Sequence, residues 1–138
     1  MRTYSICERN ESLAIDGVRI PIRWRDIDAL GHVNNAVYLT YLEELLAVVI
    51  GPVLGDDYVT ARVELDFRYE IRLSDREVVG RALVERVGTS SVTVSFGLAR
   101  ADGVAALEGR AVLVAWDPEQ RRGRPLTDAE RDALHALA

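Results

Sequence analysis

Cysteine is almost missing from this chain, and long uninterrupted apolar runs are missing altogether. Cys7 is the only cysteine among 138 residues, so no disulfide can form within the chain and an oxidising compartment is not implied. The longest apolar stretch, residues 36–50, is interrupted by Glu43 and Glu44 and is too short to span a membrane. The opening residues, MRTYSICERN, lack the apolar core of a secretory signal. We therefore expect a cytoplasmic protein with no membrane partner.

Positive charge is also in short supply. The 17 basic residues, all of them arginine, are outnumbered by 22 acidic residues, and the formal net charge is −5 at pH 7. A nucleic-acid partner requires a basic face that neutralises phosphates, so no nucleic-acid partner is expected. The sequence has no Cys/His cluster with metal-ligand spacing, no glycine-rich phosphate loop and no nucleophile elbow. We expect no bound metal and no cofactor.

Length and composition indicate one globular domain. Hydrophobic residues make up 49% of the chain and charged residues 28%, which is typical of a folded domain, and no repeat or linker interrupts the sequence. We assign residues 1–138 to a single domain, with an irregular lead-in at 1–17 and a C-terminal tail at 118–138. The tail contains a capping box, Thr127 to Glu130, which predicts a short C-terminal helix.

Residues 36–50 are predicted to form a helix that is buried on nearly every side. Asn34 or Asn35 is a suitable N-cap, because either side chain can accept a hydrogen bond from a free first-turn N–H. Gly51-Pro52 is a conventional stop signal. Between these signals apolar residues cover most of the helix circumference, and the only polar strip consists of Thr40, Glu43 and Glu44. In a domain this small, other elements must wrap such a helix.

Strands on both sides of the helix are predicted to supply the wrapping. Residues 18–25 alternate enough for a strand, although Pro21 favours a sheet edge. Residues 62–73, RVELDFRYEIRL, alternate strictly between apolar and charged. Three more strands are expected at about 77–87, at 91–100 and at 105–117. This order predicts an α+β domain with an antiparallel sheet of about five strands wrapped around one central helix, the architecture called the hotdog fold.

Residues 25–35 are the segment best suited to chemistry. Two acids, a histidine and two asparagines lie there, between the end of a strand and the start of the predicted helix. Loops on a rigid scaffold often carry reactive groups, and a helix N-terminus presents free N–H groups and positive dipole to an oxyanion. The segment can therefore supply both a carboxylate and hydrogen-bond donors to an electrophilic carbonyl.

The stretch DIDALGHVNNAVYLTYLEE resembles the signature of the 4-hydroxybenzoyl-CoA thioesterase-like branch of the hotdog superfamily. The likeness continues in LDFRYEIRLSDREV and covers roughly residues 18–117. The sequence departs from the family at Tyr69-Glu70, where Arg-Pro is frequent, and at Ser74, where glycine is usual. The resemblance implies a hydrolase that cleaves acyl thioesters.

Carried onto this sequence, the resemblance implies a catalytic carboxylate at Asp28 and a carbonyl-polarising backbone amide at about Asn35. His32 and Asn34 match polar positions that line the site in related thioesterases. Contacts with the substrate are expected from Tyr38 in the first helical turn, from Glu43, and from Thr89, Ser90 and Ser91, which match positions beside the pantetheine arm.

Each of these residues also has a structural interpretation. Without the motif, Asp28 is a common type of turn residue, and Asp26 is expected to bond the loop backbone or an arginine such as Arg25. His32 fits a satisfied loop histidine as well as a catalytic group, and the two asparagines are caps first. Glu43 belongs to a solvated strip in this interpretation.

Hydrolysis of an acyl-CoA thioester is the favoured function. The helix N-terminus polarises the thioester carbonyl, and Asp28 acts as general base or as nucleophile. CoA is part of the substrate rather than a cofactor, and acyl carrier protein is an alternative carrier. The alternative functions are a non-catalytic acyl-CoA-binding hotdog protein and a hotdog dehydratase or hydratase. Because a single sheet has open edges, we expect a homodimer or homotetramer with the site at the subunit boundary.

Overall fold

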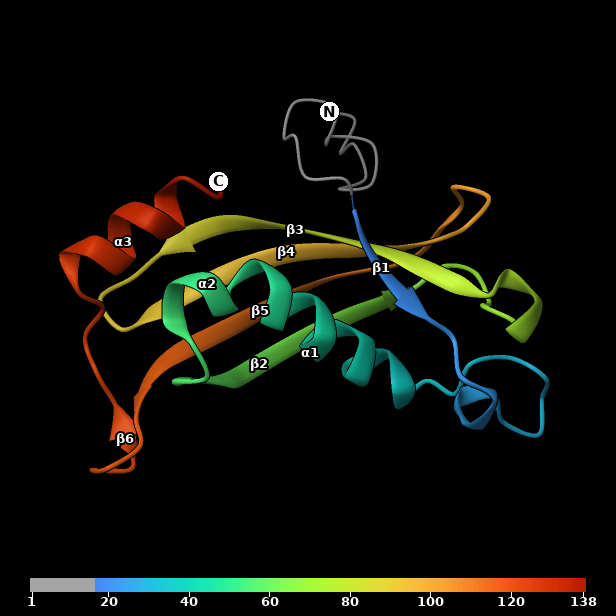
Figure 1. The fold of residues 1–138 in the computed structure, drawn as a ribbon, viewed down its shortest axis with the longest axis horizontal. Coiled ribbons are helices and arrows are strands. Elements are labelled where there is room, and N and C mark those ends of the chain that lie inside the picture. The colour runs from blue at the N-terminus through green and yellow to red at the C-terminus, as the bar shows by residue number, and fades with distance from the viewer. Residues whose placement is uncertain (1–16) are drawn as a thin grey trace.

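A computed structural model of the chain describes residues 17–138. Cys7 and nearly all of the expected lead-in therefore lie outside the described residues. The described part is an antiparallel sheet with three α-helices (Figure 1). Its strands are β1 (Val18–Pro21), β2 (Tyr58–Phe67), β3 (Glu77–Val87), β4 (Ser91–Arg100), β5 (Ala105–Asp117) and β6 (Arg122–Gly123). Its helices are α1 (Val37–Val49), α2 (Gly51–Leu54) and α3 (Asp128–His135).

The sheet curls around α1 with the strand order β1-β3-β4-β5-β2, and the short β6 pairs with β5 (Figure 1). The predicted α+β hotdog fold is therefore confirmed. Strand β1 lies at one edge, in agreement with the prediction from Pro21, because proline cannot donate a ladder hydrogen bond. Strand β2, ten residues long, forms the other edge.

Helix α1 packs on the concave face of the sheet through one side only. Its buried residues recur every three or four positions and are Tyr38, Tyr41, Leu42, Leu45 and Leu46. Gly80 of β3 permits a close approach, because a Cβ there would lie 3.0 Å from Leu45 Cδ1. The expectation of a helix buried on nearly every side is wrong, since Leu39 and Val48 are 43% and 54% exposed. A helix on one face of a single sheet keeps an outer side, however apolar that side is.

The predicted signals at the two ends of α1 are confirmed in part. The N-cap of α1 is Ala36, without a side-chain capping bond, rather than the predicted Asn34 or Asn35. Asn34 Oδ1 instead accepts a hydrogen bond of 2.9 Å from the Ala36 N–H in the turn that precedes the helix. At the other end, α1 stops at Val49 but the predicted stop signal forms the short helix α2. Pro52 is tolerated there because first-turn N–H groups have no helical partner to lose. Gly55, with a φ of +62°, ends α2.

The predicted strand at 62–73 leaves the sheet earlier than its alternation indicated. Strand β2 ends at Phe67, and the next two amides, of Arg68 and Tyr69, both donate to the Ala106 carbonyl at 2.8 and 3.1 Å. Two donors on one acceptor break the regular ladder, so the chain turns away from β5. The predicted strand at 18–25 is shorter too, since it ends at Pro21.

The C-terminal tail packs against the end of the sheet at which β3 and β4 are joined (Figure 1). Thr127 Oγ1 accepts a hydrogen bond of 3.1 Å from the Glu130 N–H, which confirms the predicted helix cap. Leu134 of α3 is fully buried, and the Val84 N–H donates to the Leu137 carbonyl at 3.0 Å. Within residues 17–138, no helix has the length and apolar character needed to cross a membrane.

Candidate active site

The loop between β1 and α1 carries the acids of the sequence motif. Ile27 and Val33 pair in an antiparallel bridge, and within it the Asp28 N–H donates to the His32 carbonyl at 3.1 Å. The Gly31 N–H donates to the Asp28 carbonyl at 3.1 Å, and the Gly31 φ of +83° is a conformation that favours glycine. These bonds give the loop a defined hairpin-like shape.

Asp28 is a half-buried residue, and its carboxylate faces the turn that begins α1. Its Oδ1 accepts a hydrogen bond of 2.9 Å from the Leu30 N–H, as in an Asx turn. Its Oδ2 lies 3.4 Å from Asn34 Nδ2, which is a long hydrogen bond. Asp28 therefore has the turn role of the structural interpretation, yet one carboxylate oxygen is only weakly engaged and can interact with a water or a substrate.

The turn that precedes α1 contains a backbone donor that is unpaired within the described part of the chain, the Asn35 N–H, close to Asp28 in the sequence. Asn34 accepts hydrogen bonds from two backbone amides of this turn. Its side chain accepts from the Ala36 N–H and its carbonyl accepts from the Val37 N–H, each at 2.9 Å. Among residues 17–138, the Asn35 N–H donates to no group, and Asn35 is exposed. This amide can bind an oxyanion at the positive end of the helix dipole.

His32 is half-buried in the same loop. Within the described part of the chain, its ring makes one polar contact, in which Nδ1 lies 3.3 Å from the Val33 carbonyl oxygen. A proton on Nδ1 can be donated to that carbonyl, which leaves Nε2 for a water or a substrate. The ring makes no hydrogen bond to Asp28 within this part of the chain.

Tyr38 lies in the core behind the loop rather than on its open side. Its side chain is 3% exposed, and its ring packs edge-on against Phe67 at 5.2 Å and Tyr41 at 6.2 Å between centroids. Burial raises the pKa of Tyr38 above its usual 10.0, opposed by a backbone hydrogen bond with Ile71. The Ile71 carbonyl accepts from the Val33 N–H at 2.7 Å, so this segment supports the loop from below.

The two glutamates of the predicted polar strip have different surroundings. Glu43 is exposed on α1. It lies near Tyr58 at the start of β2, because its charge, after burial and the charge of Asp56, contributes to raising the pKa of Tyr58. Glu44 is instead paired with Arg23, whose guanidinium donates two hydrogen bonds of 2.6 and 3.0 Å to the carboxylate. Glu43 is thus the helix glutamate that remains accessible.

The β3–β4 hairpin lies at the opposite end of the sheet from Asp28 (Figure 1). It carries the three predicted pantetheine contacts, Thr89, Ser90 and Ser91. Strand β3 begins beside the Asp28 loop, where the Ile22 N–H donates to the Arg76 carbonyl at 2.8 Å. From there β3 runs eleven residues to the hairpin, which is about 35 Å. A single chain therefore does not bring the hairpin to Asp28.

A polar network behind the loop escaped sequence reasoning. The Asp26 carboxylate is 7% exposed, and its Oδ2 accepts hydrogen bonds from the Tyr41 hydroxyl at 2.7 Å and the Arg23 N–H at 2.9 Å. The expected bond to the loop backbone is present, but the arginine that lies close is Arg23 rather than Arg25. Burial, together with the hydrogen bond to Asp26, raises the pKa of Tyr41 far above its usual 10.0. The helical period marks Tyr41 as inward-facing, but no local pattern links it to Asp26.

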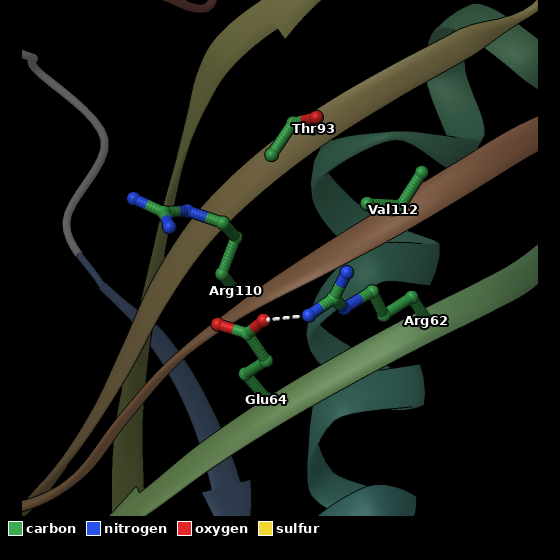
Figure 2. Close-up of a pocket in the computed structure, with 5 residues that line it drawn as sticks. All are labelled: Arg62, Glu64, Thr93, Arg110 and Val112. Carbon is green, nitrogen blue, oxygen red and sulfur yellow. Dashed lines mark hydrogen bonds and ion pairs between the residues drawn. The ribbon is translucent and has the colours of Figure 1, made fainter.

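The opposite face of the sheet carries a hollow of about 190 Å³. Its lining residues are Arg62, Glu64, Thr93, Arg110 and Val112. In Figure 2 helix α1 lies behind the sheet, so these side chains project from the face away from the helix. The two arginines are already paired, Arg62 with Glu64 at 2.6 Å and Arg110 with Glu85 at 2.7 Å. This hollow is separate from the Asp28 loop and is not part of the candidate site.

The chain is similar to known proteins in both sequence and structure. The family model described as the thioesterase superfamily matches residues 30–106, a range that begins two residues after Asp28. A thioesterase from Thermus thermophilus, solved with coenzyme A and Zn, is 33% identical over 88% of this chain and 92% of its own, with a TM-score of 0.79. A predicted thioesterase from Bacillus stearothermophilus is 23% identical over 89% and 96%, with a TM-score of 0.81, and shows similarity of fold alone. No curated protein matches the chain.

The zinc of the Thermus structure raises the question whether this chain could hold a metal. Within residues 17–138, no three His, Cys, Asp or Glu side chains come together in a way that could bind one. The Asp28 loop offers at most the Asp28 carboxylate and His32 Nε2, which is fewer than the three protein ligands that a zinc site needs. The donors among residues 17–138 therefore do not fit a metal site.

Proposed function

The chain belongs to the thioesterase superfamily and is a thioester hydrolase, and from that premise we propose that it cleaves acyl-CoA thioesters with Asp28 as the reacting carboxylate. The observation that carries the proposal is the weakly engaged Oδ2 of the Asp28 carboxylate, which faces the turn that begins α1. The Thermus relative solved with coenzyme A supports CoA rather than acyl carrier protein as the carrier. We also propose that the protein acts in the cytoplasm, as the sequence led us to expect.

In the proposed reaction, the thioester carbonyl oxygen accepts a hydrogen bond from the Asn35 N–H, and the helix dipole stabilises the charge that develops on that oxygen. Asp28 then takes a proton from an attacking water, or attacks the carbonyl carbon itself to form a mixed anhydride that water hydrolyses. In either case the carbon–sulfur bond breaks, and CoA leaves as the thiol. The reaction uses no cofactor.

Asn34 and His32 orient the reacting groups in this proposal. The Asn34 carboxamide bridges the Asp28 carboxylate at 3.4 Å and the Ala36 N–H at 2.9 Å, so it couples the carboxylate to the helix end. His32, with Nδ1 directed to the Val33 carbonyl, presents Nε2 to water or substrate. Both residues orient Asp28, its water or the substrate, and neither makes or breaks the scissile bond.

We assign the complete site to a homodimer, in which two β2 edges pair about a twofold axis. An open ten-residue edge strand is a ready partner for a second copy. The Phe67 end of β2 lies at the Asp28 end of the sheet and the Tyr58 end lies toward the hairpin (Figure 1). Because two copies of β2 pair antiparallel about a twofold axis, the hairpin end of one copy comes to the Asp28 end of the other. Thr89, Ser90 and Ser91 then reach the Asp28 site of the partner, in a dimer or a dimer of dimers.

Mixing two inactive variants tests this shared site. Asp28→Asn removes the carboxylate, and Thr89→Arg places a bulky side chain on the exposed hairpin. If each site uses Asp28 from one copy and the hairpin from the other, half of the randomly mixed dimers have one intact site. Activity should then return to about a quarter of the wild-type value after refolding together. Mixtures that stay as inactive as the separate variants, or a monomer mass in light scattering at micromolar concentration, would contradict the shared site.

An acyl-CoA panel tests the function itself. Wild-type protein is incubated with short, long and aromatic acyl-CoA thioesters, and the free thiol is measured with a chromogenic disulfide. We expect turnover of at least one thioester in the range of ordinary enzymes, about 1–10³ s⁻¹. Tight binding of acyl-CoA with no thiol release would identify the non-catalytic binder, and hydration of an unsaturated acyl chain would identify the hydratase.

A further inference from the structure

Asp26 is the only charged residue that is buried among those the structure describes. Its Oδ2 accepts two short hydrogen bonds, from the Tyr41 hydroxyl at 2.7 Å and from the Arg23 N–H at 2.9 Å. Burying a carboxylate is costly, and a neutral side chain could close the same loop with less desolvation. Bonds to a charged acceptor are shorter and stronger than neutral ones, so what the carboxylate provides is a tightly held geometry.

A second contact ties the same loop to the same helix. The Arg23 guanidinium donates two hydrogen bonds, of 2.6 and 3.0 Å, to the Glu44 carboxylate, and both side chains are about one-third exposed. Tyr41 and Glu44 are three positions apart on α1, so they lie on one face of the helix. We call Arg23, Asp26, Tyr41 and Glu44 the loop anchor.

A short path of covalent and hydrogen bonds connects the loop anchor to Asp28. The Asp26 carbonyl accepts from the Asn34 N–H at 2.9 Å, and Asn34 in turn reaches the Asp28 carboxylate. Between them, Ile27 and Val33 form the bridge that closes the loop. Movement of Asp26 relative to α1 would therefore shift Asp28 relative to the helix N-terminus.

We propose that the loop anchor positions Asp28 against the N-terminal turn of α1, so that Tyr41 and Glu44 are positioning residues for the hydrolysis although neither touches the reacting atoms. The inference rests on the proposed function. Displacing a reacting group by about 1 Å can lower a rate by about 10²-fold, and such a displacement leaves binding of the rest of the substrate largely intact. The loop anchor should therefore control kcat rather than KM.

Tyr41→Phe is the sharpest test, because it removes one hydroxyl and keeps a ring that is 0% exposed. We expect kcat to fall about 10- to 100-fold and KM to stay within about twofold of the wild-type value. The matched control is Ser95→Ala on β4, which removes a hydroxyl that donates to the Glu85 carboxylate at 2.8 Å far from the loop anchor, and it should leave both constants unchanged. Glu44→Gln should reproduce the effect without touching the core. Its control is Glu85→Gln on β3, because the Glu85 carboxylate also accepts two hydrogen bonds from one arginine, Arg110.

Amide hydrogen exchange gives a readout that does not depend on turnover. The Gly31 and Asn34 amides are hydrogen-bonded within the loop, and in Tyr41→Phe they should exchange about tenfold or more faster, while amides in the middle of β4 stay protected. Loop exchange at the wild-type rate, or a loss of stability with unchanged kcat, overturns the positioning role. If Tyr41→Phe exchanges its loop amides faster but the wild-type protein hydrolyses no thioester, the proposed function is refuted and the anchoring of the loop stands.

Discussion

Raising the pH above 10 tests the burial of Tyr41 and its bond to Asp26. Burial and that bond raise the pKa of folded Tyr41 above its usual 10.0, so the folded chain keeps a proton that the unfolded chain loses. The free energy of unfolding therefore falls as pH rises, and the contribution of Tyr41 is fully present only below about pH 10. With an unfolded pKa of 10.0, one such group costs the folded state about 1.4 kcal/mol between pH 8 and pH 11.

Urea unfolding of wild type and Tyr41→Phe at both pH values measures this contribution. The variant should be less stable at pH 8 by about 1–3 kcal/mol, because the buried Asp26 carboxylate loses a donor. It should also lose less stability than wild type on going to pH 11, by about 1.4 kcal/mol. Equal losses in the two proteins would refute the claim that the Tyr41 hydroxyl is buried against Asp26.

Three further predictions concern the scaffold and use thermal or urea unfolding as the measurement. Gly109→Ala should destabilise the fold by about 1–3 kcal/mol, because its Cβ would lie 2.2 Å from the Glu64 carbonyl oxygen, whereas Gly51→Ala, with no atom within 4 Å, should not destabilise it. Arg76→Gly should stabilise the chain by up to about 1 kcal/mol, because the Arg76 φ of +66° is strained for any residue with a Cβ. Thr127→Ala should cost about 1 kcal/mol through loss of the bond from the Glu130 N–H, and no loss would mean that the α3 cap is not formed.

Local periodicity predicted the elements because each element buries one face against its neighbours. The same signal misled at 62–73, where alternation continues to Leu73 although β2 ends at Phe67. Ile71 is fully buried there, and it packs below the Asp28 loop rather than in the sheet. Alternation reports burial, and it does not say what covers the buried residue. The exposed Leu39 and Val48 illustrate the converse, since apolar character on α1 did not ensure a covering element.

The candidate site was predictable where its residues are close in the sequence. Asp28, Asn34 and the free Asn35 amide lie within one loop and the turn that follows it, so the motif located them together. The Asp26–Tyr41 bond joins residues 15 positions apart and the Arg23–Glu44 pair joins residues 21 positions apart. Neither distance matches a helical or strand period, so such pairs become visible only once the loop is folded against α1.

Asp28→Asn, assayed for thiol release from the best acyl-CoA substrate, tests the reaction directly. The asparagine oxygen can still accept from the Leu30 N–H, and the contact with Asn34 is already long at 3.4 Å, so we expect a stability change of no more than about 1 kcal/mol. The lost negative charge removes the general base or nucleophile, and kcat should fall by about 10²-fold or more, on the scale of a lost catalytic acid–base group. A folded variant that keeps most of the wild-type kcat would contradict the assignment and leave Asp28 with a turn role alone.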